Sequence, residues 1–234
     1  MKYFFVVISF CLFFLSSVKA QPQPNSPKLI VNIVVDQMRQ DYLYRFWDLY
    51  GEDGFKKLVN EGYNFSNCHF SYYPTFTAAG HANISTGATP SVHGVVGNDW
   101  YENINGSKMY CVMDTSVRGV GTATSVGQMS AKNLKATTFG DELKFANNYR
   151  SKVFGISIKD RGAILSAGHV ADAAYWLDSK EGNFISSTYY IDELPNWVKV
   201  FNKKDLVTQY LNQTWTNSIS TEILEKYTDE DNGS

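Results

Sequence analysis

The stretch PTFTAAGHANISTG, residues 74–87, decides the fold. It predicts a helix over residues 77–86, entered after Pro74 and closed by Gly87. Thr77 then lies at the helix N-terminus, where backbone N–H groups and the helix dipole favour phosphate oxygens. A threonine hydroxyl is a weak nucleophile until a metal ion or a base activates it. Threonine is also a common N-cap residue, so a purely structural role for Thr77 is the alternative.

Two apolar segments on either side of this stretch predict strands. Residues 29–35 (LIVNIVV) are rich in β-branched side chains, as in a strand buried on both faces, and Asp36 follows them. Residues 152–158 (KVFGISI) predict a second strand, which ends at Lys159 and Arg161. The other expected elements are helices over 52–61, 139–147 and 194–201 and an exposed strand over 183–190.

Strands separated by helices in this order predict an α/β fold with a parallel sheet. In such sheets, ligands collect at the carboxyl ends of the strands. We therefore expect Asp36, Thr77, Lys159 and Arg161 to converge at one edge of the sheet.

The first twenty residues differ in character from the rest of the chain. Lys2, an apolar run over residues 3–15 and the small residues around Ala20 are typical of a secretory signal peptide. The apolar run is too short for the roughly 20 residues that a membrane span needs, although a retained anchor is the alternative. Residues 21–27 are read as a linker. We expect export to the periplasm or beyond, with no stable membrane span after cleavage.

The net charge bears on nucleic-acid binding, and the cysteine content bears on disulfide formation. The net charge of −2 and the pI near 6.1 give no basic patch of the kind that nucleic acids require. Beyond the signal, Cys68 and Cys111 remain, and a disulfide between them is plausible in an oxidising compartment. Two separate buried thiols are the alternative.

The segment that begins at Pro74 continues as STGATPSVHGVVGN and ends at Asn98. It resembles the nucleophile segment of the nucleotide pyrophosphatase/phosphodiesterase branch of the alkaline phosphatase superfamily. The resemblance implies that Thr77 attacks phosphorus, that Asn98 donates a hydrogen bond to a phosphate oxygen and that Asp36 binds zinc. It also implies an α/β/α sandwich of the alkaline phosphatase type with a parallel sheet, incomplete in this chain.

Lys159 and Arg161 match the Lys-x-Arg pair of the PafA-type alkaline phosphatases within that branch. The planar guanidinium of arginine and the point charge of lysine suit the two charges of a phosphate monoester. The alternative is a salt-bridge set with Asp160 on a solvated loop.

The resemblance also implies a two-zinc site, of which this sequence contains only the ligands Asp36 and Thr77. The four histidines lack the family's ligand spacing, and His81 and His93 are expected to serve packing and turns. We therefore expect residues 28–234 to be the N-terminal part of a catalytic domain, weakly active or inactive alone.

Hydrolysis of phosphate monoesters through a phosphothreonine intermediate is the function that the resemblance implies. A phosphodiesterase or nucleotide pyrophosphatase of the same superfamily is one alternative. A non-catalytic exported binding module is the other, favoured by the missing ligands and by an aromatic content of 15%.

Overall fold

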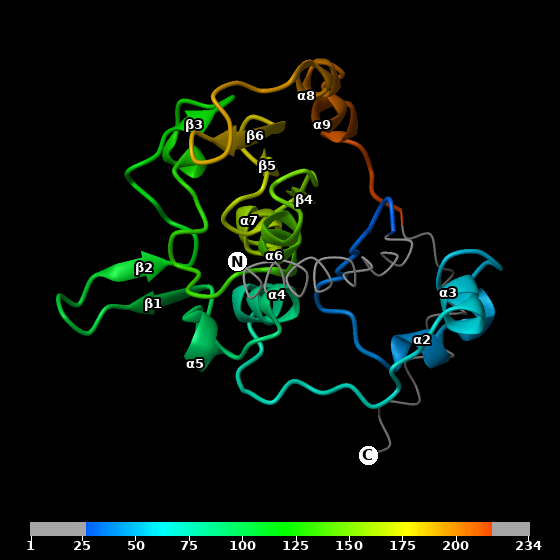
Figure 1. Ribbon diagram of the computed structural model, residues 1–234. Coiled ribbons are helices and arrows are strands. Elements are labelled where there is room, and N and C mark those ends of the chain that lie inside the picture. Colours follow the sequence, from blue (N-terminus) through cyan, green and yellow to red (C-terminus); the bar gives the residue numbers. More distant parts are fainter. Residues whose placement is uncertain (1–26, 217–234) are drawn as a thin grey trace, which may run out of the picture. The chain divides into compact units, whose positions relative to one another are not determined.

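The computed structural model describes residues 27–216, and the signal peptide predicted over residues 1–20 lies outside them. Contacts divide the chain into one unit up to Val35 and another from Asp36, and each is described by itself. Except for the 3₁₀ helices η1 and η2, Figure 1 labels all the helices and strands that the second unit contains. These are α2 (Tyr42–Arg45), η1 (Trp47–Leu49), α3 (Phe55–Glu61), α4 (Thr77–Thr86), α5 (Pro90–His93), β1 (Asp99–Tyr101), β2 (Lys108–Tyr110), β3 (Gly119–Val120), η2 (Ser125–Gly127), α6 (Phe139–Ala146), β4 (Phe154–Ser157), α7 (Asp160–Ala167), β5 (Ala173–Asp178), β6 (Asn183–Ser187), α8 (Asn196–Asn202) and α9 (Leu206–Tyr210).

The strand expected over residues 29–35 is not formed. The segment has no regular secondary structure, and Leu29 and Ile33 are each 77% exposed, where a strand buried on both faces had been predicted. β-branched composition favours an extended chain, but a strand also needs a neighbour that supplies hydrogen bonds. Composition alone does not reveal that neighbour.

The main sheet has four strands in the order β3-β6-β5-β4. β4 and β5 are parallel, with Phe154 opposite Ala173, whereas β5 and β6 are antiparallel, as are β6 and β3. The turn that joins β5 to β6 passes through Gly182 at a φ of 72°, and so short a link cannot make the crossover that a parallel pair requires. The α/β class is confirmed, but this sheet is mixed and not purely parallel.

Helices cover both faces of this sheet. α7 lies on one face, where Gly155 of β4 makes room for it: a Cβ atom there would come 2.2 Å from the carbonyl oxygen of Ala163. On the other face, Val198 of α8 packs against Ala173 and Tyr175 of β5. β6 is therefore an inner strand with Ile185 fully buried, so its predicted exposure was wrong.

Helices α4 and α7 lie next to each other (Figure 1) and are in contact. Small side chains line this contact. Ala78 and Ala82 of α4 and Ala163 of α7 are each 0% exposed and lie in one core cluster with Trp176. Alanine lets two helix backbones approach closely because little side chain stands between them. This contact joins the helix that carries Thr77 to the helix that carries Arg161.

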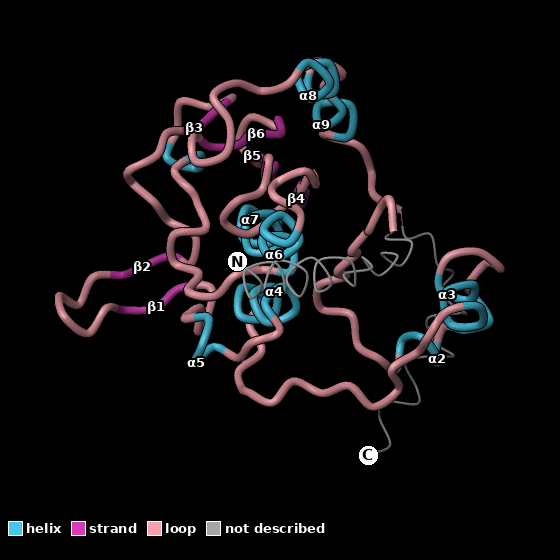
Figure 2. The backbone as a smooth tube through the Cα atoms, in the orientation of Figure 1, coloured by secondary structure: helices cyan, strands magenta, loops and turns pink. Residues whose placement is uncertain are grey.

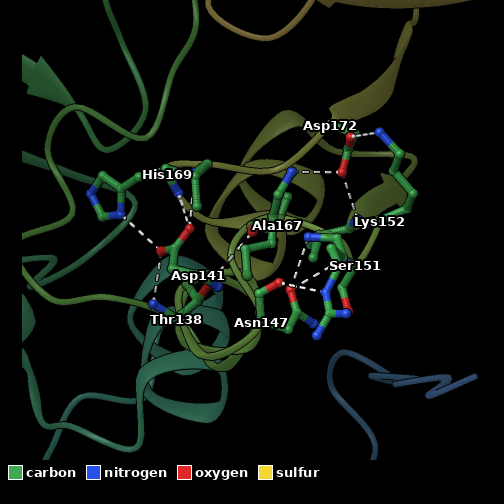
Figure 3. A network of polar contacts seen from close by, with 12 residues as sticks. Thr138, Asp141, Asn147, Ser151, Lys152, Ala167, His169 and Asp172 are labelled. Atoms are coloured by element: carbon green, nitrogen blue, oxygen red, sulfur yellow. Dashed lines mark hydrogen bonds and ion pairs between the residues drawn. The ribbon is translucent and has the colours of Figure 1, made fainter. Parts of the chain in front are cut away.

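A polar network around Asp141 connects α6 to the loop after α7 (Figure 3). The side chain of Thr138 accepts from the backbone N–H of Asp141, and the Asp141 carboxylate accepts from that of Thr138, which forms a capping box. Asp141 is fully buried and also accepts from Nδ1 of His169 at 3.0 Å, while Nε2 of His169 donates to the carbonyl of Leu134 at 2.9 Å. The network stabilises the start of α6.

The predicted helix over 77–86 coincides with α4, and those over 139–147 and 194–201 correspond to α6 and α8. The helix predicted over 52–61 begins later, at Phe55, because Gly54 has a φ of 67° that a helix cannot include. A long loop over residues 62–76 leads from α3 to α4 (Figure 2).

Cys68 is exposed and Cys111 is buried, and both are free thiols, so the plausible disulfide is not formed. Cys111 belongs to the core cluster, whereas Cys68 is at the surface, so the alternative of two buried thiols holds for Cys111 alone. Within residues 27–216 we find no helix with the length and apolarity that a bilayer crossing demands.

Candidate functional site

Thr77 is the first residue of α4. Phe76 precedes the helix in an extended conformation and offers no side-chain acceptor, and Gly87 ends the helix in the left-handed conformation that glycine favours. Thr77 is half-buried at this N-terminus, whereas Ala78 behind it is fully buried. The helix therefore presents the threonine hydroxyl at the surface on a rigid base.

The hydroxyl of Thr77 donates a hydrogen bond to Oδ2 of Asp36, at 3.2 Å. Asp36 is exposed, and its Oδ1 accepts from the backbone N–H of Gln37 at 3.1 Å. Two oxygens 41 positions apart in sequence thus lie within bonding distance of each other. A carboxylate and a hydroxyl in this arrangement are hard oxygen donors that can bind the same divalent cation.

These donors fit a metal ion only in part. Residues 27–216 contain no group of three or more His, Cys, Asp or Glu side chains that could hold one. Asp36 and Thr77 are therefore two candidate ligands of a set that the described residues do not complete.

Asn98 lies directly beside Thr77 in space. Its Oδ1 accepts the backbone N–H of Ala78 at 3.0 Å, so the side chain acts as the N-terminal cap that Phe76 cannot provide. Since the oxygen is engaged, the amide is oriented and its Nδ2 remains as the donor. An amide held in this way can donate to an anion at the N-terminus of α4.

Lys159 and Arg161 lie where β4 ends and α7 begins. Lys159 is exposed at the N-cap position of α7, and its backbone N–H donates to the hydroxyl of Ser157 at 3.3 Å. Arg161 is half-buried in the first turn, and its Nη1 donates to the hydroxyl of Tyr110 at 3.1 Å. Burial lowers the pKa of Arg161, but the hydrogen bond with Tyr110 and the nearby Asp160 outweigh it, so the net pKa is raised and the charge is retained.

Asp160 does not form the solvated salt-bridge set that was the alternative for this segment. It lies in the first turn of α7, where its Oδ1 accepts from the hydroxyl of Tyr110 at 2.6 Å and from the backbone N–H of Arg161 at 2.7 Å. The carboxylate is thus built into the helix start, and Tyr110 is a member of this cluster that the sequence did not suggest. Fifty residues separate Tyr110 from Asp160, and no local pattern marks their contact.

His81 is a residue of α4, and its side chain reaches Ser166 of α7. It is 8% exposed, its Nδ1 lies 3.4 Å from the hydroxyl of Ser166, and burial lowers its pKa. The charge of Asp36 raises this pKa and that of Arg161 lowers it, and both effects are smaller than that of burial. His81 therefore serves helix packing beneath the cluster, as expected.

His93 takes the turn role expected for it. It is fully buried, and its Nδ1 accepts the backbone N–H of Val95 at 3.1 Å.

The structure thus places the hydroxyl of Thr77 against Asp36, and the side chain of Asn98 against the backbone of Ala78 at the start of the same helix. Arg161 lies on α7, which packs against that helix. The expected geometry was wrong in one respect, because Asp36 does not follow a strand. A separate cavity of about 670 Å³ lies among residues 118–125, Thr188 and Lys199, and none of the predicted site residues lines it.

Comparisons with known proteins show the family of this chain. The family model described as type I phosphodiesterase / nucleotide pyrophosphatase matches residues 30–232. The chain is 53% identical over 210 residues to a protein of Myroides odoratus named calcium-transporting ATPase, covering 90% of this chain and 38% of that one. It is 52% identical over 190 residues to alkaline phosphatase PafA of Elizabethkingia meningoseptica, covering 81% of this chain and 35% of that one.

Solved structures of PafA are also similar. The wild-type crystal structure matches with a TM-score of 0.82 and 50% identity over 85% of this chain and 38% of that one. A PafA variant with one threonine, one asparagine, one lysine and one arginine replaced matches with a TM-score of 0.77 and 48% identity over 80% of this chain and 36% of that one. The chain therefore spans less than two fifths of the length of these relatives. It belongs to the type I phosphodiesterase / nucleotide pyrophosphatase family.

Proposed function

We propose that this chain carries part of the active site of an exported phosphatase that hydrolyses phosphate monoesters through a covalent phosphothreonine at Thr77. The observation that carries the proposal is the hydroxyl of Thr77, at the N-terminus of α4 and 3.2 Å from the carboxylate of Asp36. The N-terminus of a helix binds phosphoryl oxygens, and Asp36 is a candidate ligand for a metal ion. A nucleophile at this position therefore lies next to both the substrate anion and the metal ligand.

Three further residues supply positive charge and hydrogen bonds to the phosphoryl group. The oriented amide of Asn98 donates from the side of α4, and Lys159 and Arg161 donate from the start of α7. Fixed donors of this kind stabilise charge on the equatorial oxygens during transfer. The PafA variant supports this set, because it replaces the same four residue types in the same order, with the Thr–Asn spacing of 21 and the Lys–Arg spacing of 2 that this chain shows.

We assign Asp36 and Thr77 as ligands in a two-zinc site. When bound, zinc lowers the pKa of the attacking hydroxyl and neutralises charge on the phosphoryl oxygens. In this chain, Asp36 holds the hydroxyl of Thr77 in place, and the first turn of α4 keeps it directed outward.

One observation favours the phosphodiesterase alternative: the matching family model is described as a phosphodiesterase / nucleotide pyrophosphatase. In that case Lys159 and Arg161 would contribute little to catalysis. Comparing p-nitrophenyl phosphate with bis-p-nitrophenyl phosphate in the complete product of the gene separates the two functions. Preference for the monoester by tenfold or more supports the phosphatase.

Replacing Thr77 tests the proposal directly. In the complete gene product, Thr77→Ala should lower monoester turnover by at least 10²-fold, because the covalent route is lost, whereas Thr77→Ser keeps a hydroxyl and part of the rate. Acid quenching during turnover followed by mass spectrometry should find phosphate on residue 77 of the wild type and of Thr77→Ser but not of Thr77→Ala. Activity of Thr77→Ala above a tenth of the wild-type rate would reject the nucleophile assignment.

A further inference from the structure

The hydroxyl of Tyr110 lies between two groups of opposite charge. Tyr110 ends β2, and its hydroxyl donates to Oδ1 of Asp160 at 2.6 Å and accepts from Nη1 of Arg161 at 3.1 Å. A guanidinium can only donate and a carboxylate can only accept, so the order of the chain is fixed: Arg161 donates to Tyr110, and Tyr110 donates to Asp160. Phenylalanine could occupy the same space but could make neither bond.

The hydroxyl keeps its proton in this position. Burial raises the pKa of Tyr110, and the charge of Asp160 raises it further. Tyr110 is therefore a neutral phenol over the whole range in which the protein can be assayed, and both hydrogen bonds persist throughout it.

This bridge leaves part of the guanidinium of Arg161 available for a ligand. The hydrogen bond with Tyr110 uses one of the five N–H donors of the guanidinium, at Nη1. Nε is buried and unpaired within residues 27–216, so the donors that a ligand can reach are those at the end of the fork. An arginine side chain is flexible. A guanidinium that is already held at one nitrogen loses less conformational freedom than a free one when its other N–H groups bind an oxyanion. Tyr110 thus fixes Arg161 without using up its donors.

The hairpin of β1 and β2 also ties Tyr110 to Asn98. Asn98 immediately precedes β1, and its carbonyl oxygen accepts the backbone N–H of Cys111, the residue after Tyr110, at 3.0 Å. Asp99 pairs with Tyr110 in the hairpin register. One short hairpin therefore carries both residues: Asn98, the amide donor, precedes β1, and Tyr110, which holds the guanidinium of Arg161, ends β2.

We infer that Tyr110 is a positioning residue for Arg161 and sets the guanidinium relative to Asn98 for binding a doubly charged phosphate monoester. The inference rests on the proposed function. In this inference Tyr110 does not contact the substrate. It orients Arg161, which does.

A double-mutant cycle in the complete gene product tests it. Tyr110→Phe, Arg161→Ala and the double variant are compared by kcat/KM for p-nitrophenyl phosphate and for bis-p-nitrophenyl phosphate. Arg161→Ala should lower monoester kcat/KM about 10- to 100-fold, as expected for losing charge-assisted hydrogen bonds. Tyr110→Phe should lower it about 5- to 20-fold, and the double variant should be no worse than Arg161→Ala, because Tyr110 acts through Arg161.

The diester rate distinguishes a positioning role of Tyr110 from a merely structural one. A structural defect would lower kcat/KM for both substrates. Tyr110→Phe should change diester kcat/KM less than twofold, since the guanidinium matters most for the second charge of a monoester. Tyr101→Phe is the matched control, because it removes a hydroxyl from the same hairpin at a side chain that is 68% exposed. It should leave both rates unchanged.

Three results would overturn the inference: an unchanged monoester rate in Tyr110→Phe, equal losses on both substrates, or the full Tyr110→Phe loss in the Arg161→Ala background. If Arg161→Ala lowers the monoester rate and Tyr110→Phe does not, only the inference fails. If Thr77→Ala retains activity, the proposed function fails, and the inference fails with it.

Discussion

His169 has a hydrogen-bond acceptor at each ring nitrogen, the carboxylate of Asp141 at Nδ1 and the carbonyl of Leu134 at Nε2. Only the imidazolium can donate to both at once. The hydrogen bond to Asp141 raises the pKa of His169, and although burial lowers it, the net pKa lies above its ordinary value of 6.5. No local pattern in the sequence indicates this role for His169.

The raised pKa of His169 has a defined effect on stability. The folded protein binds the proton more tightly than the unfolded chain, so the contribution of His169 is complete below pH 6.5 and is lost as pH rises through the folded pKa. We expect the Tm to fall by about 2–4 °C across that rise, the effect of losing about 1 kcal/mol in a chain of this size. Thermal unfolding followed by circular dichroism measures it.

Two variants give the control for this prediction. His169→Gln should already have the lower Tm at acidic pH and a flatter pH profile, while His69→Gln, at an exposed residue, should follow the wild type. Parallel pH profiles of wild type and His169→Gln would refute the assignment.

At the scale of elements, α4 depends on a residue 21 positions beyond its start. Phe76 cannot cap the helix, and Asn98 accepts the N–H of Ala78 in its place. The same side chain is assigned to phosphate binding, so one amide has two separable functions: its oxygen stabilises the helix and its nitrogen donates to the substrate.

Two substitutions at Asn98 separate these functions. Asn98→Asp keeps an oxygen acceptor for Ala78 but loses the amide donor, so we expect stability close to wild type with monoester kcat/KM reduced by 10²-fold or more, because a carboxylate repels phosphate. Asn98→Ala should additionally lower the free energy of unfolding by about 1 kcal/mol, the usual cost of a lost cap. Urea denaturation gives the stability, and equal stability losses in both variants would contradict the capping role.

The sequence predicted the elements whose bounds are set by neighbouring residues and misjudged those that depend on distant residues. Gly87 and the run of small residues marked α4 to the residue, because a helix end is a local property. Residues 29–35 and β6 were misjudged, since burial and pairing depend on neighbours distant in sequence. The contact of Tyr110 with Asp160 was missed for the same reason.

At the scale of the whole molecule, family membership was predictable from the segment between Pro74 and Asn98, while the metal site was only partly so. Asp36 and Thr77 are two candidate ligands, and the described residues contain no His, Cys, Asp or Glu cluster to extend them. Three protein ligands are the usual minimum for a catalytic zinc. The roles of Lys159 and Arg161 stay predictions, although their place at the start of α7 agrees with them.

The 234-residue chain alone is therefore expected to bind zinc weakly and to hydrolyse p-nitrophenyl phosphate slowly or not at all. Isothermal titration with Zn²⁺ should give similar, shallow isotherms for the wild type and for Asp36→Asn. Robust zinc-dependent turnover by the purified chain would refute this expectation.

The burial of Cys111 next to Tyr110 makes the hairpin observable in solution. Burial raises the pKa of the Cys111 thiol to about 12, so it stays protonated and unreactive in the folded protein, whereas Cys68 is exposed. Of the two cysteines in the described part of the chain, a maleimide reagent should modify Cys68 at once and Cys111 only when the hairpin opens. The labelling rate of Cys111 would then report how often the segment that holds Asn98 and Tyr110 leaves the core, without any introduced probe.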